Sequence, residues 1–141
     1  MIFFQYLFYN QYAEIKGRGG DPRRAQLNTL ILSAVLITLY VILTFVVYDH
    51  FYPRFLEKNL SMGGASGRNI GRTLAFTISL IVFFTMRILI GNKTWYDQTV
   101  ERFDRMAPEE QQRVAKKGIR YFVLASLPVV IFIMWALISI F

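Results

Sequence analysis

The 22 residues from Leu27 to Tyr48, LNTLILSAVLITLYVILTFVVY, carry no charged side chain. As a helix this stretch would be about 33 Å long, enough to cross a hydrocarbon core of about 30 Å. Its many β-branched residues lower helix propensity in water. In lipid, however, unpaired backbone amides are too costly, so the helix forms anyway. The stretch therefore predicts a first transmembrane helix.

Two further apolar runs have the same character. Thr73 to Gly91, TLAFTISLIVFFTMRILIG, contains a single charge at Arg87. Tyr121 to Phe141 is uncharged and contains Pro128, whose missing amide hydrogen favours a kink. Each run is close to or above the 18 residues or so expected of a membrane span. The sequence thus predicts an all-α integral membrane protein with three transmembrane helices.

The amino-acid composition excludes several kinds of chemical site. The 141 residues are 55% hydrophobic and 18% charged, with a mean hydropathy of +0.38, whereas soluble domains carry about 25% charged residues. With no cysteine and one histidine, the chain lacks disulfides, thiolate metal sites and any multi-histidine site of its own. The N-terminus lacks the basic region and cleavage site of a signal peptide. We therefore expect no metal and no cofactor.

We expect one membrane domain, 1–141, divided into six segments. These are an interfacial N-terminal tail (1–26), span one (27–48), an outer connection (49–72), span two (73–91), a cytoplasmic amphipathic connection (92–120) and span three (121–141).

The positions of the basic residues predict the orientation. Twelve of the 16 Lys and Arg residues lie in the tail, at Arg87 or in the second connection, and the others lie in the first connection. The positive-inside rule then places the N-terminus in the cytoplasm and the C-terminus on the outer side. No transit peptide rich in Arg and Ser opens the chain, which favours a bacterial inner membrane over a mitochondrial one.

The first twelve residues hold six aromatic side chains and are too few to cross a bilayer. Because tyrosine favours the membrane–water interface, they predict a helix lying in that interface or packed against a neighbour. The segment GRGGDPRR, from Gly17 to Arg24, predicts a turn after it. The tail is interpreted as an apolar anchor, with a partner-binding segment as the alternative.

Small residues recur every four positions at Gly67, Gly71, Ala75 and Ser79. On a helix they share one face, and small residues let two helices approach closely in lipid. They predict a helix-packing stripe, unless the glycines only form a flexible loop. A phosphate-binding loop is excluded, because three residues instead of four separate Gly67 from Gly71. No nucleotide is therefore expected.

The second connection predicts an amphipathic helix and a helical hairpin. Tyr96, Val100, Phe103 and Met106 fall on one helical face. Pro108 suits the first position of a new helix, which we expect to run on into the third span.

The start of that second helix presents a basic face. Arg113, Lys116, Lys117 and Arg120 are spaced i, i+3, i+4, i+7. This face is interpreted as a solvated, positive-inside flank, or as a binding site for anionic lipid headgroups or for an acidic surface of a partner.

Candidate chemical residues are few. Arg87 is an intramembrane charge one turn from its helix end, so we expect it to reach the headgroups; a buried ion pair or an ion pathway are the alternatives. His50 is a weak candidate ligand for a metal or pigment. Glu109 and Glu110 are adjacent and point to different helix faces, so they do not form paired catalytic carboxylates.

These features favour a non-catalytic accessory or structural subunit of a larger membrane protein complex. Its expected partners are other integral membrane subunits and anionic lipids. Base-reading motifs are absent, so no nucleic acid is expected. The alternative is a small homo-oligomeric channel or transporter subunit, which would need a line of Ser and Thr hydroxyls through the membrane. An enzyme is disfavoured because no acid, base or metal-ligand set is present.

Overall fold

The computed structural model describes residues 2–51 and 67–140, and these residues form helices and no strand. The helices are α1 (Ile2–Gly17), α2 (Arg23–Phe51), α4 (Gly67–Ile90), α5 (Lys93–Asp104) and α6 (Pro108–Ile140). Among them α2, α4 and α6 are long and apolar enough to cross a membrane. This confirms the all-helical fold with three candidate spans, and it indicates a membrane-embedded protein.

Local sequence signals set several helix ends. The Asn92 side chain caps α5 by accepting a hydrogen bond from the backbone N of Trp95 at 2.7 Å. Pro108 occupies the first position of α6, where its missing N–H costs nothing. Gly19 has a φ of +71°, which glycine adopts without strain. The turn predicted between Gly17 and Arg24 is therefore confirmed.

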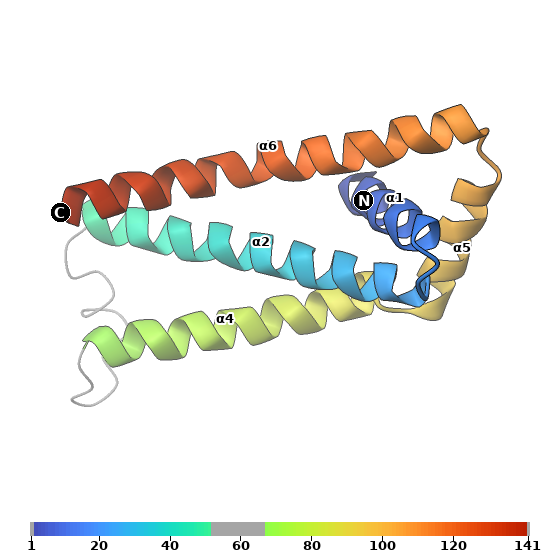
Figure 1. Ribbon diagram of the computed structural model, residues 1–141. Coiled ribbons are helices and arrows are strands. Elements are labelled where there is room, and N and C mark those ends of the chain that lie inside the picture. The colour runs from blue at the N-terminus through green and yellow to red at the C-terminus, as the bar shows by residue number, and fades with distance from the viewer. Residues whose placement is uncertain (1, 52–66, 141) are drawn as a thin grey trace.

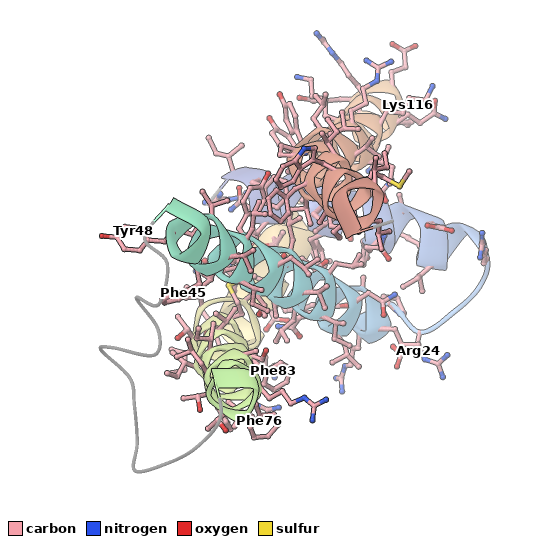
Figure 2. All side chains as sticks on the ribbon, turned by 90° about the vertical axis from the view of Figure 1, so that its left-hand side faces the viewer. Arg24, Phe45, Tyr48, Phe76, Phe83 and Lys116 are labelled. Carbon is pink, nitrogen blue, oxygen red and sulfur yellow. The ribbon has the colours of Figure 1, made fainter. Side chains whose placement is uncertain are left out.

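The three long helices lie in a row with α2 in the middle. Figure 1 shows α4 along one side of α2 and α6 along the other, and the end-on view in Figure 2 keeps that order. Between α2 and α4, the side chains of Leu30 and Ala34 pack against Met86 and Ile90. Because a row is not a closed bundle, one side of α4 and one side of α6 stay uncovered by the described chain.

The contact between α2 and α6 includes a side-chain hydrogen bond deep in the apolar region. The hydroxyl of Tyr40 donates to the backbone oxygen of Ala125. Pro128 lies three residues further on, and its missing N–H leaves the carbonyl of Leu124, the residue before Ala125, without its usual helical donor. The helix nevertheless continues through Pro128 to Ile140.

At one end of the row, α1 and α5 pack together with the adjoining ends of α2 and α6 (Figure 1). We name the buried cluster there the aromatic cap. Its members are Phe8, Tyr9, Tyr12, Ala25, Phe103 and Val114. Tyr9 stacks on Phe103 with ring centroids 5.1 Å apart, so the apolar face of α5 covers α1.

The structure refines the predicted segments in two ways. First, α1 turns one face toward protein: Leu7, Phe8, Tyr9 and Tyr12 are all buried. They meet apolar surface on the other cap helices, which removes them from both water and lipid. Second, α4 begins at Gly67, inside the segment expected to be a flexible connection. At the other end of the connection α2 continues to Phe51, and residues 52–66 lie outside the described residues.

Candidate functional site

Ser79, one member of the predicted helix-packing stripe, lies on the side of α4 that faces α2. Ala75 and Ser79 are half-buried, and the Ser79 hydroxyl donates to the backbone oxygen of Ala75 at 2.7 Å. A Cβ added at Gly71 would meet no atom within 4 Å, so no close approach occurs at that glycine within the described chain. Gly67 only begins the helix.

Ser79 also borders an apolar groove between α2 and α4. The groove has a volume of about 380 Å³ and includes Thr38 from α2 and Phe76 and Phe83 from α4. Figure 2 marks the two phenylalanines on the α4 ribbon. The groove shows that α2 and α4 diverge on this side instead of closing over the stripe.

Among the described glycines, Gly118 makes the closest approach to another helix, and the sequence analysis did not single it out. A Cβ there would lie 2.0 Å from the backbone oxygen of Tyr6. Close by, the Asn10 side-chain amide donates to the backbone oxygen of Ala115 at 3.1 Å. The backbone of α1 therefore rests directly on α6. A glycine inside a long helix costs about 1 kcal/mol, and that cost was the available signal of a packing role.

A second set of small residues was also missed. Ala25, Thr29 and Ser33 recur every four residues on α2 and are all fully buried. The Thr29 hydroxyl donates to the backbone oxygen of Ala25 at 2.8 Å, while the Ser33 hydroxyl has no partner within the described part of the chain. The four-residue spacing that drew attention to α4 is equally present here.

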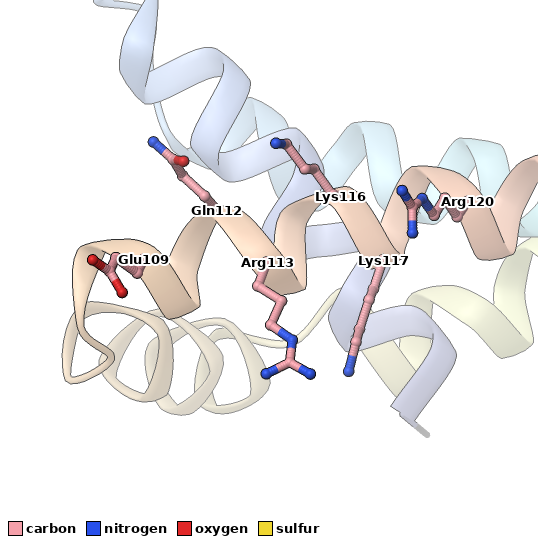
Figure 3. Close-up of a pocket in the computed structure, with 6 residues that line it drawn as sticks. All are labelled: Glu109, Gln112, Arg113, Lys116, Lys117 and Arg120. Atoms are coloured by element: carbon pink, nitrogen blue, oxygen red, sulfur yellow. The ribbon is translucent and has the colours of Figure 1, made fainter.

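The basic face of α6 borders one hollow of about 440 Å³, together with Glu109 and Gln112 (Figure 3). Arg113 and Lys117 project from one side of the helix and Lys116 from the other. The Lys117 ammonium also lies 5.9 Å from the centre of the Tyr6 ring.

Within residues 2–51 and 67–140, no acidic side chain forms an ion pair with the basic face. The ion pairs between described residues join Lys16 to Asp104, Arg18 to Glu14 and Arg105 to Glu101. None of them includes Arg113, Lys116, Lys117 or Arg120. Four cationic side chains therefore border one hollow on the described surface.

The other two candidates are simpler. Arg87 lies in the last turn of α4 with an exposed side chain, and no described acidic residue forms an ion pair with it. The side chain of His50 lies outside the described part of the structure. In that part no group of three or more His, Cys, Asp or Glu side chains could hold a metal ion.

The fold and these surfaces define a helical membrane protein with a protein-packed cap and a basic helix face. Comparison with protein-family models, with curated proteins and with solved structures finds no match to this chain. Functional inference therefore starts from the geometry.

Proposed function

We propose that the chain is a non-catalytic accessory subunit of a larger membrane protein complex, to which it contributes helix packing, lipid contacts and assembly. The open row of spans is the observation that carries this proposal. In the most apolar 18-residue stretch of α4, only 11% of the residues are buried within the described chain. In the corresponding stretch of α6, only 6% are buried. Helices in lipid associate through close packing and interhelical hydrogen bonds, and these open faces leave room for both.

The hydroxyl groups of the spans favour this proposal over a channel or transporter subunit. Thr44 donates to the backbone oxygen of Tyr40, and Thr85 donates to that of Ile81. A hydroxyl that bonds to its own helix is less available to a permeating ion or solute. Self-bonded hydroxyls of this kind, which also include those of Thr29 and Ser79, are poorly placed to form the continuous polar line that conduction needs.

We place the chain in a bacterial inner membrane, with the aromatic cap and N-terminus in the cytoplasm and the C-terminus outside. The excess of Lys and Arg at the capped end supports this orientation. Single cysteines at Gln111 and Ser61 test the orientation. An impermeant thiol reagent on intact cells should label Ser61→Cys and leave Gln111→Cys unlabelled, and the reverse pattern would overturn the assignment.

Purification in mild detergent from the native membrane tests the complex. We expect foreign membrane subunits in stoichiometric amount, whereas a chain that purifies only as a homo-oligomer would favour the channel or transporter alternative.

Two adjacent phenylalanines provide a test variant and a matched control for mapping the subunit contact. Phe84 is 58% exposed on the open side of α4, and Phe83 is half-buried toward α2. Foreign subunits lost from Phe84→Ala and retained by Phe83→Ala would map their contact to the open side.

A further inference from the structure

We propose that the basic face of α6 binds one anionic phospholipid, with its phosphate among Arg113, Lys117 and Arg120 and its acyl chains on the apolar surface below. The inference deepens the proposed function and rests on its placement of the chain in a membrane. It does not require that a partner subunit be present.

The charge of the hollow selects an anion. Four cationic side chains border it, and within the described residues none of them has an acidic partner. Arginine forms paired hydrogen bonds with phosphate oxygens, and lysine adds a mobile point charge. The one carboxylate at the hollow belongs to Glu109, at the first turn of α6 and farthest from the apolar run.

The distances of these residues from the start of the apolar run match the depth of the lipid headgroup layer. The uncharged run of the third span begins at Tyr121. With a rise of 1.5 Å per residue, Arg120 lies at the edge of that run, Lys117 about 5 Å above it and Arg113 about 11 Å above it. The headgroup layer extends roughly 5–8 Å beyond the hydrocarbon core. The long side chain of Arg113 covers the remaining distance.

The surface directly below the charges is apolar. Ile119, Val123 and Leu124 are exposed, and together with Arg120 they border a second hollow of about 390 Å³. Arg120 therefore belongs to both hollows, at the level where α6 changes from basic to apolar. A free phosphate ion or a soluble acidic segment would use only the upper hollow, whereas a phospholipid would use both.

Contact with α1 orders one side of the site. The backbone of α1 rests on Gly118, and the Lys117 ammonium lies over the Tyr6 ring. Figure 3 shows the Lys117 side chain projecting from α6 toward the α1 ribbon. A lysine held by an aromatic ring loses less conformational freedom when it binds a ligand.

The test uses the full chain, purified and placed in phosphatidylcholine nanodiscs that contain a minor fraction of phosphatidylglycerol. Native mass spectrometry should find phosphatidylglycerol retained in preference to phosphatidylcholine. A photoactivatable phosphatidylglycerol should label the peptide that contains Ile119 and Leu124. Labelling that misses this peptide would overturn the proposal without the need for any variant.

Two triple variants distinguish a defined lipid-binding site from non-specific electrostatic attraction to anionic lipid. Arg113→Gln with Lys117→Gln and Arg120→Gln should lower the preference for phosphatidylglycerol by roughly tenfold or more. The control removes three exposed charges from other helices at the same end: Arg24→Gln, Lys93→Gln and Arg102→Gln. It should retain the preference. Equal loss in both triples, or no loss in the first, would contradict a defined site.

A third comparison distinguishes binding of the whole phospholipid from binding of phosphate alone. Phosphatidylglycerol should raise the melting temperature of the delipidated protein, whereas inorganic phosphate at the same concentration should not. Equal stabilisation by phosphate would overturn the phospholipid assignment. The failure of the proposed complex would look different, because a chain without foreign subunits would still retain phosphatidylglycerol.

Discussion

The aromatic cap and the row of spans bury apolar side chains to very different extents. In the cap, Phe8 is 0% exposed and stacks on Tyr12. In the row, Ile88 on α4 is 74% exposed and Ile131 on α6 is 64% exposed. Both regions carry many apolar side chains, but the cap buries its aromatic rings while much of the apolar surface of α4 and α6 stays exposed.

The difference follows from the solvent that each region meets. In water, apolar surface is driven into protein at about 25 cal/mol per Å². In lipid that drive is absent, so helices associate only where backbones approach closely or polar groups pair. The cap can therefore fold on the chain's own surfaces, while the row stays open to lipid and to other helices.

Removal of a buried ring should give the largest difference between the two regions. Phe8→Ala should destabilise the cap by about 3–5 kcal/mol, because a fully buried aromatic side chain is lost. Phe84→Ala, on the exposed side of α4, should change the stability of the isolated chain by less than about 0.5 kcal/mol. Thermal unfolding in detergent measures both, and equal losses would show that the row is packed as tightly as the cap.

A pair of glycines sharpens the same contrast. Gly118→Ala should destabilise the chain by about 1–3 kcal/mol, because the new methyl group would overlap the Tyr6 carbonyl and displace α1. Gly71→Ala should be neutral or stabilising by up to about 1 kcal/mol, because alanine favours the helix and the space is open. Protease cleavage near the N-terminus should increase in the first variant alone. Unchanged cleavage there would contradict the contact.

High pH should loosen the cap and spare the row. Burial raises the pKa of Tyr9 above its usual 10.0, with Arg102 opposing and Tyr6 adding to the shift. Burial likewise raises the pKa of Tyr96. Because neutral tyrosine is favoured in the folded state, its contribution is complete below about pH 10 and is lost as the pH rises through the folded pKa.

Tyrosinate absorbance should therefore rise together with the loss of cap structure above about pH 10. The double variant Tyr9→Phe and Tyr96→Phe should delay that loss. If the cap melted at the same pH in the double variant, other groups would be responsible.

The smallest effect is expected at the rim of the cap. Lys16 and Asp104 form an ion pair at 3.1 Å, and the hydrogen bond from Lys16 to Asp104 raises the pKa of the lysine. Both side chains are largely exposed, so Asp104→Asn should cost less than about 1 kcal/mol and nothing at high salt. Arg105→Gln breaks a pair within α5 alone and should not change how α5 packs. Melting temperatures at two salt concentrations give the comparison.

The three spans were predictable because the length of an uncharged run decides them almost alone. The turn around Gly19 and the apolar face of α5 followed equally local rules. The inward orientation of α1 does not follow from such local rules. Its aromatic pattern suits a lipid interface or a protein core, and the deciding contacts, such as Asn10 with Ala115, lie 105 residues apart in sequence.

The two glycines show the same limit at a candidate site. Gly71 and Gly118 both lie inside long helices, and sequence spacing favoured Gly71. Only the structure reveals that α1 crosses at Gly118, while no described atom lies within 4 Å of a Cβ built at Gly71. The basic face differs, because four charges on one helix share a surface whatever the tertiary fold. That clustering could be predicted, whereas the hollow around it could not.

The unbroken course of α6 gives the molecule a lever. Its 33 residues form a rod about 50 Å long. The crossing at Gly118 divides it into arms of about 15 Å toward Pro108 and 33 Å toward Ile140. A rotation about that crossing moves the far end of α6 roughly twice as far as the capped end. A small tilt of α6 at the capped end would therefore correspond to a larger displacement at Ile140.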